Sequence, residues 1–190
     1  MLLYCSDPRI SDTLPPISSR AAKVRASALA SALLARAYFD FCGGELPAIE
    51  KTPLGKPFFP DEPQIYFSIS HSKSCVLCAI SNSPIGVDTQ QHRSISPATV
   101  KRLTTPRELT DLSFFEIWVL RESFFKLTGR GSLRNLPFYK QDGEIILPEN
   151  DIYCHLYNDI ENSSTAAIST ANDFPEHLTK IPANLLLEQL

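Results

Sequence analysis

The sequence predicts an α+β fold, on the order of its elements and on its composition. A helical pattern comes first along the 190-residue chain, short strand patterns follow, and helices and further strands come after them. Elements in blocks of this kind are typical of the α+β class. Hydrophobic residues make up 43% of the chain, enough for a core, and the length allows one domain or two small lobes. Fifteen prolines indicate many breaks between short elements.

The first helix is expected over Ser18–Cys42. Apolar side chains recur there at helical spacing: Leu29, Leu33, Leu34, Ala37, Tyr38 and Phe41. The pair Gly43-Gly44 ends the pattern. A proline-rich loop then runs through Pro63.

Three short apolar runs are expected to be strands: Tyr66–Ser70, Val76–Ser81 and Ile85–Asp88. The first two are close enough in sequence to form a hairpin, with its turn around Ser72–Ser74.

Two further helices are expected to begin at hydroxyl–proline pairs, where a cap residue precedes proline at the first helical position: Ser96-Pro97 and Thr105-Pro106. Ser113 and Glu116 have the spacing of a capping box, which predicts a helix that ends at Gly129. The last expected elements are three strands and a short helix, at Glu144–Leu147, Ile152–Tyr157, Ala166–Thr170 and Ala183–Gln189.

Acidic residues gather towards the end of the chain. Residues 141–190 hold nine of the 21 acidic residues and one of the 18 basic residues, so residues 1–140 hold 17 bases against 12 acids. This first part could attract an anion, although a solvated basic face would give the same count. No basic stripe with interleaved aromatic residues is present, which argues against a nucleic-acid partner.

The sequence indicates a cytoplasmic protein that does not enter a membrane. The N-terminus lacks the basic start and apolar stretch of a signal peptide, and no run approaches membrane-spanning length. Five cysteines, an odd number without framework spacing, suit a reducing compartment. Cys75 and Cys78 form a C-x-x-C pattern, but in a strand this odd spacing points them to opposite faces. We expect both to be small core residues.

A candidate metal site combines two carboxylates. Asp88 ends a predicted strand and Glu122 lies in the helix after the capping box. Magnesium prefers oxygen ligands and often takes only one or two protein carboxylates, which leaves positions for substrate phosphates. Trp118 and Lys126 lie one turn on either side of Glu122, on the same helix face. The alternative for Glu122 is a surface ion pair with Lys126.

Three sequence blocks stand in one order along the chain: Gly55-Lys56-Pro57 with Pro60, then Phe67-Ser68-Ile69-Ser70-His71-Ser72, then Gly86-Val87-Asp88 with Trp118, Glu122 and Lys126. The set resembles the 4′-phosphopantetheinyl transferases of the longer, surfactin-synthetase-activating type. It covers roughly residues 53–131, and its specificity comes from the order and spacing of all three blocks rather than from any one of them.

This resemblance implies a fold of two similar α+β lobes related by a pseudo-twofold axis, with the active site in the cleft between them. We therefore expect an N-terminal lobe over residues 1–84, which binds the coenzyme A phosphates. The C-terminal lobe, over residues 85–190, would carry the metal and the catalytic residues.

The resemblance also implies an activity. The 4′-phosphopantetheine group of coenzyme A would be transferred to a serine of an apo acyl or peptidyl carrier protein, with Mg²⁺ as cofactor and adenosine 3′,5′-bisphosphate as the leaving product. We expect a monomer. Two other classes stay open. One is a non-catalytic module that binds coenzyme A or a carrier protein, and the other is a structural partner protein that uses the acidic C-terminal region.

Catalytic roles follow from the resemblance for Asp88, Glu122 and Lys126, with the first two as metal ligands. The proton acceptor stays open between Glu122, Lys126 and a bound water. Gln90 stands where many members of the family have a second acid after the aspartate, and it could offer a neutral oxygen to the metal. Arg121 replaces the usual lysine, and its planar fork either suits a phosphate or projects to solvent.

The coenzyme A side of the site is expected at Lys56, Ser70 and His71. These three residues resemble the part of the family that binds the 3′-phosphate, and each can donate a hydrogen bond to it. Cations on the first helix are further candidates for this pocket: Arg20, Lys23 and Arg25. The alternatives are a histidine that caps the hairpin turn, and helix-surface cations that are simply solvated.

Overall fold

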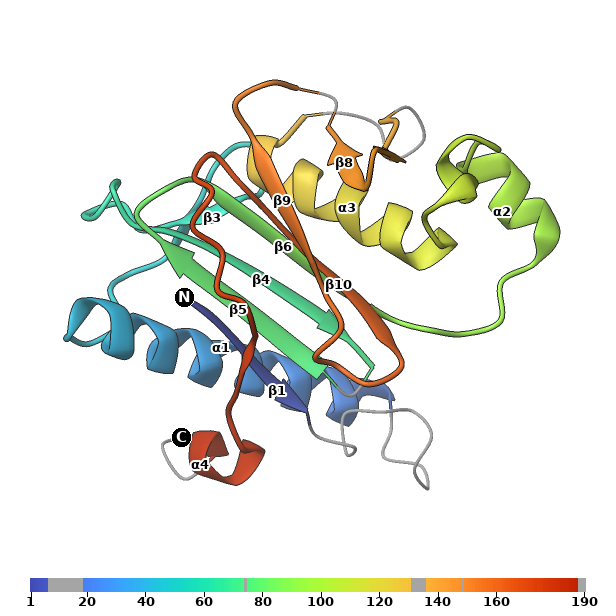
Figure 1. Ribbon diagram of the computed structural model, residues 1–190. Coiled ribbons are helices and arrows are strands. Elements are labelled where there is room, and N and C mark those ends of the chain that lie inside the picture. Colours follow the sequence, from blue (N-terminus) through green and yellow to red (C-terminus); the bar gives the residue numbers. More distant parts are fainter. Residues whose placement is uncertain (7–18, 74, 131–135, 148, 188–190) are drawn as a thin grey trace.

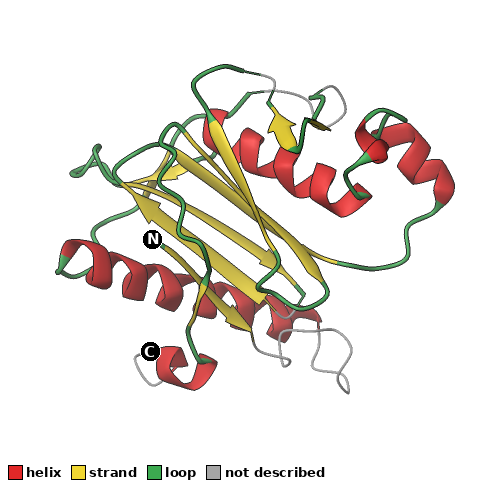
Figure 2. Ribbon diagram, in the orientation of Figure 1, coloured by secondary structure: helices red, strands yellow, loops and turns green. Residues whose placement is uncertain are grey.

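The computed structural model describes residues 1–6, 19–73, 75–130, 136–147 and 149–187. Two sheets lie between two long helices (Figure 1), and short helices and strands are attached around them (Figure 2). The α+β class is therefore confirmed. No helix in the described ranges is long and apolar enough to cross a membrane.

The first sheet belongs mainly to the N-terminal half. Its strand order is β11-β1-β5-β4, formed by Thr179–Lys180, Leu2–Ser6, Cys75–Ser81 and Tyr66–Ser72. The three longer strands are antiparallel to their neighbours, whereas β11 runs parallel to β1. Helix α1, Ser19–Cys42, packs on one face of this sheet (Figure 1).

The second sheet comes from the C-terminal half, in the order β6-β10-β9. Its strands are Ile85–Gln91, Ser163–Ser169 and Tyr153–Tyr157, all antiparallel. Helix α3, Phe114–Thr128, covers the outer face of this sheet (Figure 1). Side chains from the inner faces of both sheets form one shared apolar cluster, which includes Leu2, Leu77, Ile85, Val87 and Ala167. The layers are therefore helix, sheet, sheet and helix.

Strands β4 and β6 join the two sheets through side chains. Alternate serine hydroxyls of β4 accept hydrogen bonds from alternate backbone N–H groups of β6, in a constant register that makes the strands parallel. The pairs are Ser68 with Val87 at 3.1 Å, Ser70 with Thr89 at 3.3 Å, and Ser72 with Gln91 at 2.8 Å. We call this row of bonds the serine seam. It satisfies one edge of β6, while the other edge pairs with β10.

The helices expected from capping signals are confirmed in most cases. Helix α1 begins within one residue of its expected start. Helix α2, Pro97–Leu103, begins directly after Ser96, and helix α3 has the predicted capping box. Gly129 ends α3 with a φ of 66°, a left-handed conformation that favours glycine. The prediction of a helix that begins at Thr105-Pro106 was wrong. Only the 3₁₀ turn η2, Glu108–Thr110, follows, and the reason lies in the buried Glu108 side chain, described below.

Most expected strands are confirmed, with shifted ends: β4, β5, β6, β8 (Glu144–Ile146), β9 and β10. Four strands were missed: β1, β2 (Glu50–Lys51), β3 (Pro57–Phe58) and β7 (Tyr139–Gln141). Strand β1 is buried on both faces, so it shows no alternation that periodicity could detect. The two-residue strand β11 was missed as well. The final helix α4, Ala183–Leu187, was expected over Ala183–Gln189, and residues 188 and 189 of that span lie outside the described residues.

The C-terminal segment returns to the first half of the chain. Strand β11 pairs with β1, and helix α4 packs on α1 through Leu186. Strand β5 of the first sheet ends at Ser81 and strand β6 of the second sheet begins at Ile85, and the lobe boundary expected between them stays a prediction. Residues 179–187 nevertheless pack with the N-terminal half.

The C-x-x-C pair has the predicted orientation. Cys75 lies in the cluster between the sheets, whereas Cys78 lies in the cluster under α1. Burial raises the pKa of each thiol to about 12, so both stay protonated at neutral pH. Both behave as small core residues, as expected from their spacing.

Arg121 corrects both expectations for it, because it contacts neither solvent nor an open phosphate site. Its side chain is 2% exposed, and its guanidinium donates to Glu108 Oε1 at 2.6 Å. It also donates to the carbonyls of Leu136 and Leu103. Glu108 is 1% exposed and accepts from the backbone N–H groups of Thr105 and Phe138. This buried pair attaches the segments before and after α3 to the helix, and it holds the chain at η2 in a turn.

Helix α3 touches strand β6 backbone to backbone at Gly86. A Cβ atom placed on Gly86 would lie 2.1 Å from the Ser123 carbonyl oxygen and 2.6 Å from the Leu127 nitrogen. Both distances are far inside van der Waals contact, and both atoms belong to the backbone of α3. Only glycine allows this approach, so Gly86 sets the distance between the strand that carries Asp88 and the helix that carries Glu122.

Gly86→Ala is expected to destabilise the protein by about 1–3 kcal/mol, the usual range for overpacking, because the helix backbone must move away from the strand. The matched control is Gly44→Ala. Gly44 has no atom within 4 Å of an added Cβ and has no positive φ, so this change should be neutral or slightly stabilising. Urea unfolding of both variants makes the measurement. Equal stability of the two would contradict the close contact.

Arg121→Met is expected to cost about 3–5 kcal/mol, because it leaves the buried Glu108 carboxylate without its cation. The double variant with Glu108→Gln should recover much of this loss, since the uncompensated charge is removed. Unfolding free energies of the two single variants and the double variant form the cycle. Simple additivity of the two single effects would show that the pair is not coupled.

Candidate active site

Asp88 lies on β6 with its carboxylate buried, and its two oxygens have different surroundings. Oδ1 accepts from the Ser70 hydroxyl at 2.6 Å and from the Lys126 ammonium at 2.7 Å. Lys126 also donates to the Val87 carbonyl at 3.0 Å. Oδ2 has no hydrogen-bond partner among the described residues, and it is not enclosed like a fully buried atom. One oxygen is therefore fixed, and the other is available to a ligand.

Glu122 lies on α3, half-buried, near the Asp88 carboxylate. Burial raises the pKa of Glu122, the negative charge of Asp88 raises it further, and Lys126 opposes the rise. Within the described part of the chain its carboxylate accepts no hydrogen bond. The surface pair between Glu122 and Lys126, which sequence alone left open, is not formed, because Lys126 binds Asp88 instead.

These two carboxylates fit a magnesium ion by their chemistry. Both offer oxygens that have no hydrogen-bond partner within the described residues, and their proximity raises the free energy of holding two negative charges together. Among the described residues, no group of three or more His, Cys, Asp or Glu side chains gathers as a metal site. A two-carboxylate site of this kind suits Mg²⁺, which keeps its remaining positions for water and phosphate oxygens.

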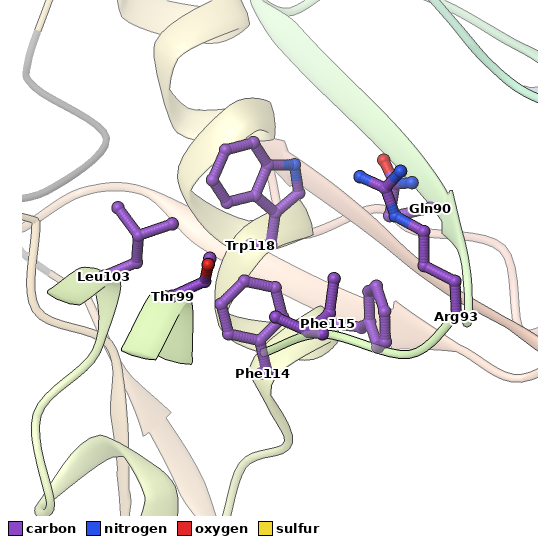
Figure 3. Close-up of a pocket in the computed structure, with 8 residues that line it drawn as sticks. Gln90, Arg93, Thr99, Leu103, Phe114, Phe115 and Trp118 are labelled. Atoms are coloured by element: carbon purple, nitrogen blue, oxygen red, sulfur yellow. The ribbon is translucent and has the colours of Figure 1, made fainter. Parts of the chain in front are cut away.

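Gln90 follows Asp88 on the same face of β6 and lines a pocket beside α3. The pocket is lined by Gln90, Arg93, Ile95, Thr99, Leu103, Phe114, Phe115 and Trp118. Figure 3 shows the Arg93 guanidinium beside the Gln90 amide, across from the Trp118 ring. Phe114 stacks on Trp118 with ring centroids 6.2 Å apart. The site therefore opens at one end into an aromatic pocket with one cation at its edge.

The residues expected around the 3′-phosphate are not brought together. Lys56 donates to the Leu127 carbonyl at 2.7 Å, at the end of α3, and burial lowers its pKa. His71 is exposed on β4, next to Ser72, which bonds to Gln91. Leu127 lies beside Gly86 at the start of β6, whereas Ser72 bonds to Gln91 at the end of β6. The Lys56 ammonium and Ser72, the neighbour of His71, therefore lie towards opposite ends of this strand.

Helix α1 carries the other cations that were expected at this pocket. Figure 1 shows the start of α1 at the same end of the molecule as the β4–β5 turn that follows His71. Arg25 is half-buried there. The side chains of Arg20 and Lys23 lie outside the described residues.

Sequence reasoning missed two parts of the site. The aromatic pocket was not expected, although Phe114 and Trp118 have the i, i+4 spacing that places side chains on one helix face. The seam was also missed. Its signal was the alternation of Ser68, Ser70 and Ser72 along a strand, which puts three hydroxyls on one face.

No model of a protein family matches the chain. Several curated proteins do. The 4′-phosphopantetheinyl transferase Sfp of Bacillus subtilis (strain 168) is 32% identical over 151 residues, which cover 70% of this chain and 67% of Sfp. The 4′-phosphopantetheinyl transferase gsp of Aneurinibacillus migulanus is 36% identical over 91 residues, covering 43% of this chain and 38% of gsp. HetI of Nostoc sp. is 33% identical over 93 residues, covering 40% and 39%. Because the similarity to Sfp extends over two thirds of that protein, the chain belongs to the 4′-phosphopantetheinyl transferase family.

Proposed function

We propose that this protein transfers the 4′-phosphopantetheine group of coenzyme A to a serine of an apo acyl or peptidyl carrier protein, at a Mg²⁺ site formed by Asp88 and Glu122. The transferase activity rests on membership of the family. The observation that carries the site assignment is the meeting of two carboxylates and the Lys126 ammonium where β6 and α3 touch.

The reaction forms a bond between the carrier serine oxygen and the β-phosphorus of coenzyme A, and breaks the bond to the bridging oxygen of the diphosphate. Adenosine 3′,5′-bisphosphate leaves with that oxygen. A bound Mg²⁺ ion would neutralise part of the diphosphate charge. The chain's own residues position the groups and stabilise the charge, which is the main protein contribution to phosphoryl transfer.

Lys126 suits a phosphate contact. A lysine ammonium has three protons, and two are donated to Asp88 Oδ1 and the Val87 carbonyl. The third is available to a phosphoryl oxygen. Glu122 suits the role of proton acceptor by its position, because it lies near Asp88 and accepts no hydrogen bond within the described part of the chain, whereas the Lys126 ammonium is bound to Asp88. The serine proton would then pass to Glu122 directly or through a water.

The 3′-phosphate would lie at the His71 end of the site. His71 is exposed, helix α1 begins at the same end of the molecule as the end of β4 (Figure 1), and the Lys56 ammonium is bound to the Leu127 carbonyl at the end of α3. Gln90 remains a candidate for a neutral metal ligand, through its position after Asp88 on β6.

The two halves, each a sheet covered by one long helix, would be the two pseudo-twofold lobes. Their boundary would fall at residue 84/85, and the returning segment would belong to the first lobe. A monomeric, cytoplasmic protein completes the proposal, supported by five cysteines that form no disulfide.

The activity is tested by incubating the protein with coenzyme A, Mg²⁺ and a panel of apo carrier proteins. The mass of each carrier protein is then measured by mass spectrometry. A gain equal to one phosphopantetheine group on a carrier serine is the expected result. Binding of coenzyme A without any such gain, across the panel, would point to a non-catalytic module.

Asp88→Ala and Glu122→Ala should each lower kcat/KM by at least ~100-fold, the size of losing one preorganised electrostatic group. Gln90→Ala should stay within about tenfold, since an amide holds a cation less strongly than a carboxylate. Asp111→Ala, an exposed acid just before α3, is the matched control and should keep full activity. Near-normal rates for Asp88→Ala or Glu122→Ala would refute the carboxylate assignment.

Discrimination between coenzyme A and 3′-dephospho-coenzyme A locates the 3′-phosphate. One charge-assisted hydrogen bond is worth ~1.5–3 kcal/mol, so His71→Ala should reduce this discrimination about 10- to 150-fold. Lys56→Ala should weaken both substrates alike, because Lys56 binds the end of α3. The ratio of kcat/KM for the two substrates is measured for each variant, which cancels general folding defects. If the preference for coenzyme A were lost only in Lys56→Ala, the 3′-phosphate would lie at the Lys56 end of the site.

A further inference from the structure

Ser70 has no proton left for a substrate. Its side chain is 5% exposed. The hydroxyl accepts from the Thr89 N–H at 3.3 Å, as one bond of the serine seam. It donates its single proton to Asp88 Oδ1 at 2.6 Å. Both roles of the hydroxyl are filled inside the protein, so the coenzyme A phosphate contact expected from sequence does not fit this side chain.

We propose that Ser70 is a positioning residue, which fixes the Asp88 carboxylate so that Oδ2 faces the metal. The proposal rests on the metal site of the proposed function. The terminal torsion of an aspartate is broad, so the carboxylate does not hold one orientation by itself. Here Ser70 and Lys126 both donate to the same oxygen, and only the other oxygen stays available.

The seam makes Ser70 rigid enough for this task. Its hydroxyl oxygen accepts from the Thr89 N–H and its proton is donated to Asp88 Oδ1, so two bonds fix the side chain. Thr89 adjoins Asp88 on β6, so the seam bond and the carboxylate bond hold neighbouring residues of one strand. Partners outside the ligand shell commonly change metal affinity by 10- to 100-fold when they are removed.

Ser68 provides a matched control on the same strand. It is 5% exposed, like Ser70, and it accepts from the Val87 N–H at 3.1 Å in the same seam. No carboxylate accepts from its hydroxyl within the described residues. Each variant should lose the seam bond, about 1 kcal/mol, and Ser70→Ala should also lose its bond to the Asp88 carboxylate. Only Ser70→Ala should weaken metal binding.

The test measures Mn²⁺ binding by electron paramagnetic resonance, with coenzyme A present and in the absence of a carrier. Ser70→Ala should weaken Mn²⁺ binding at least ~10-fold, whereas Ser68→Ala should keep the wild-type affinity. Ser70→Cys, close in size but a weak donor, should also bind Mn²⁺ poorly, and it serves if the alanine variant does not fold. Ser70→Thr, which keeps the hydroxyl, should restore binding.

Four outcomes would overturn the proposal. Wild-type affinity in Ser70→Ala and Ser70→Cys, with binding lost in Asp88→Ala, would remove the positioning role and leave the metal site intact. An equal loss of Mn²⁺ affinity in Ser68→Ala and Ser70→Ala would show that the serine seam as a whole, and not the bond from Ser70 to Asp88, supports metal binding. If Ser70→Ala lost the preference for coenzyme A over its 3′-dephospho form, Ser70 would be a contact of the 3′-phosphate instead. Failure of the wild-type protein to bind Mn²⁺ would overturn the proposed function together with this inference.

Discussion

The backbone contact between α3 and β6 at Gly86 is the constraint on which the site depends. Because an added Cβ would lie 2.1 Å from the Ser123 carbonyl, the helix approaches the strand as closely as backbone atoms allow. Asp88 is two residues further along the strand, and Glu122 and Lys126 lie on the same stretch of helix. The contact brings these three charged groups together without a loop. Elements of the scaffold hold such geometry better than mobile segments do.

The charges at this contact are arranged unevenly. Lys126 and Ser70 both bind one oxygen of Asp88, while Glu122 and the other Asp88 oxygen keep no protein partner in the described chain. Such an arrangement costs free energy in the protein alone, since burial and mutual repulsion disfavour the charged form of Glu122. A divalent cation would relieve this cost, and the substrate diphosphate would complete its ligands.

The sequence predicted the parts of the fold that local chemistry determines. Helix α1 followed from its apolar spacing, and the ends of α3 followed from the Ser113–Glu116 capping box and Gly129. It did not predict features that depend on distant segments. Strand β1 is buried on both faces, and Arg121 finds its partner Glu108 only because η2 folds back beside α3. In the site, spacing predicted the Asp88–Glu122–Lys126 group. It did not predict the bond from Ser70 to Asp88, since the β4–β6 seam pairs segments whose register no local pattern records.

The central claim is that Asp88 Oδ2 and Glu122 share one divalent cation at this contact. A crystal structure of the protein with coenzyme A and Mn²⁺ tests it most directly, through the anomalous scattering of manganese. The account predicts one strong anomalous peak within ligand distance of Asp88 Oδ2 and a Glu122 oxygen, with Ser70 and Lys126 still bound to Asp88 Oδ1. A peak elsewhere, or a manganese ion that contacts neither carboxylate, would contradict it.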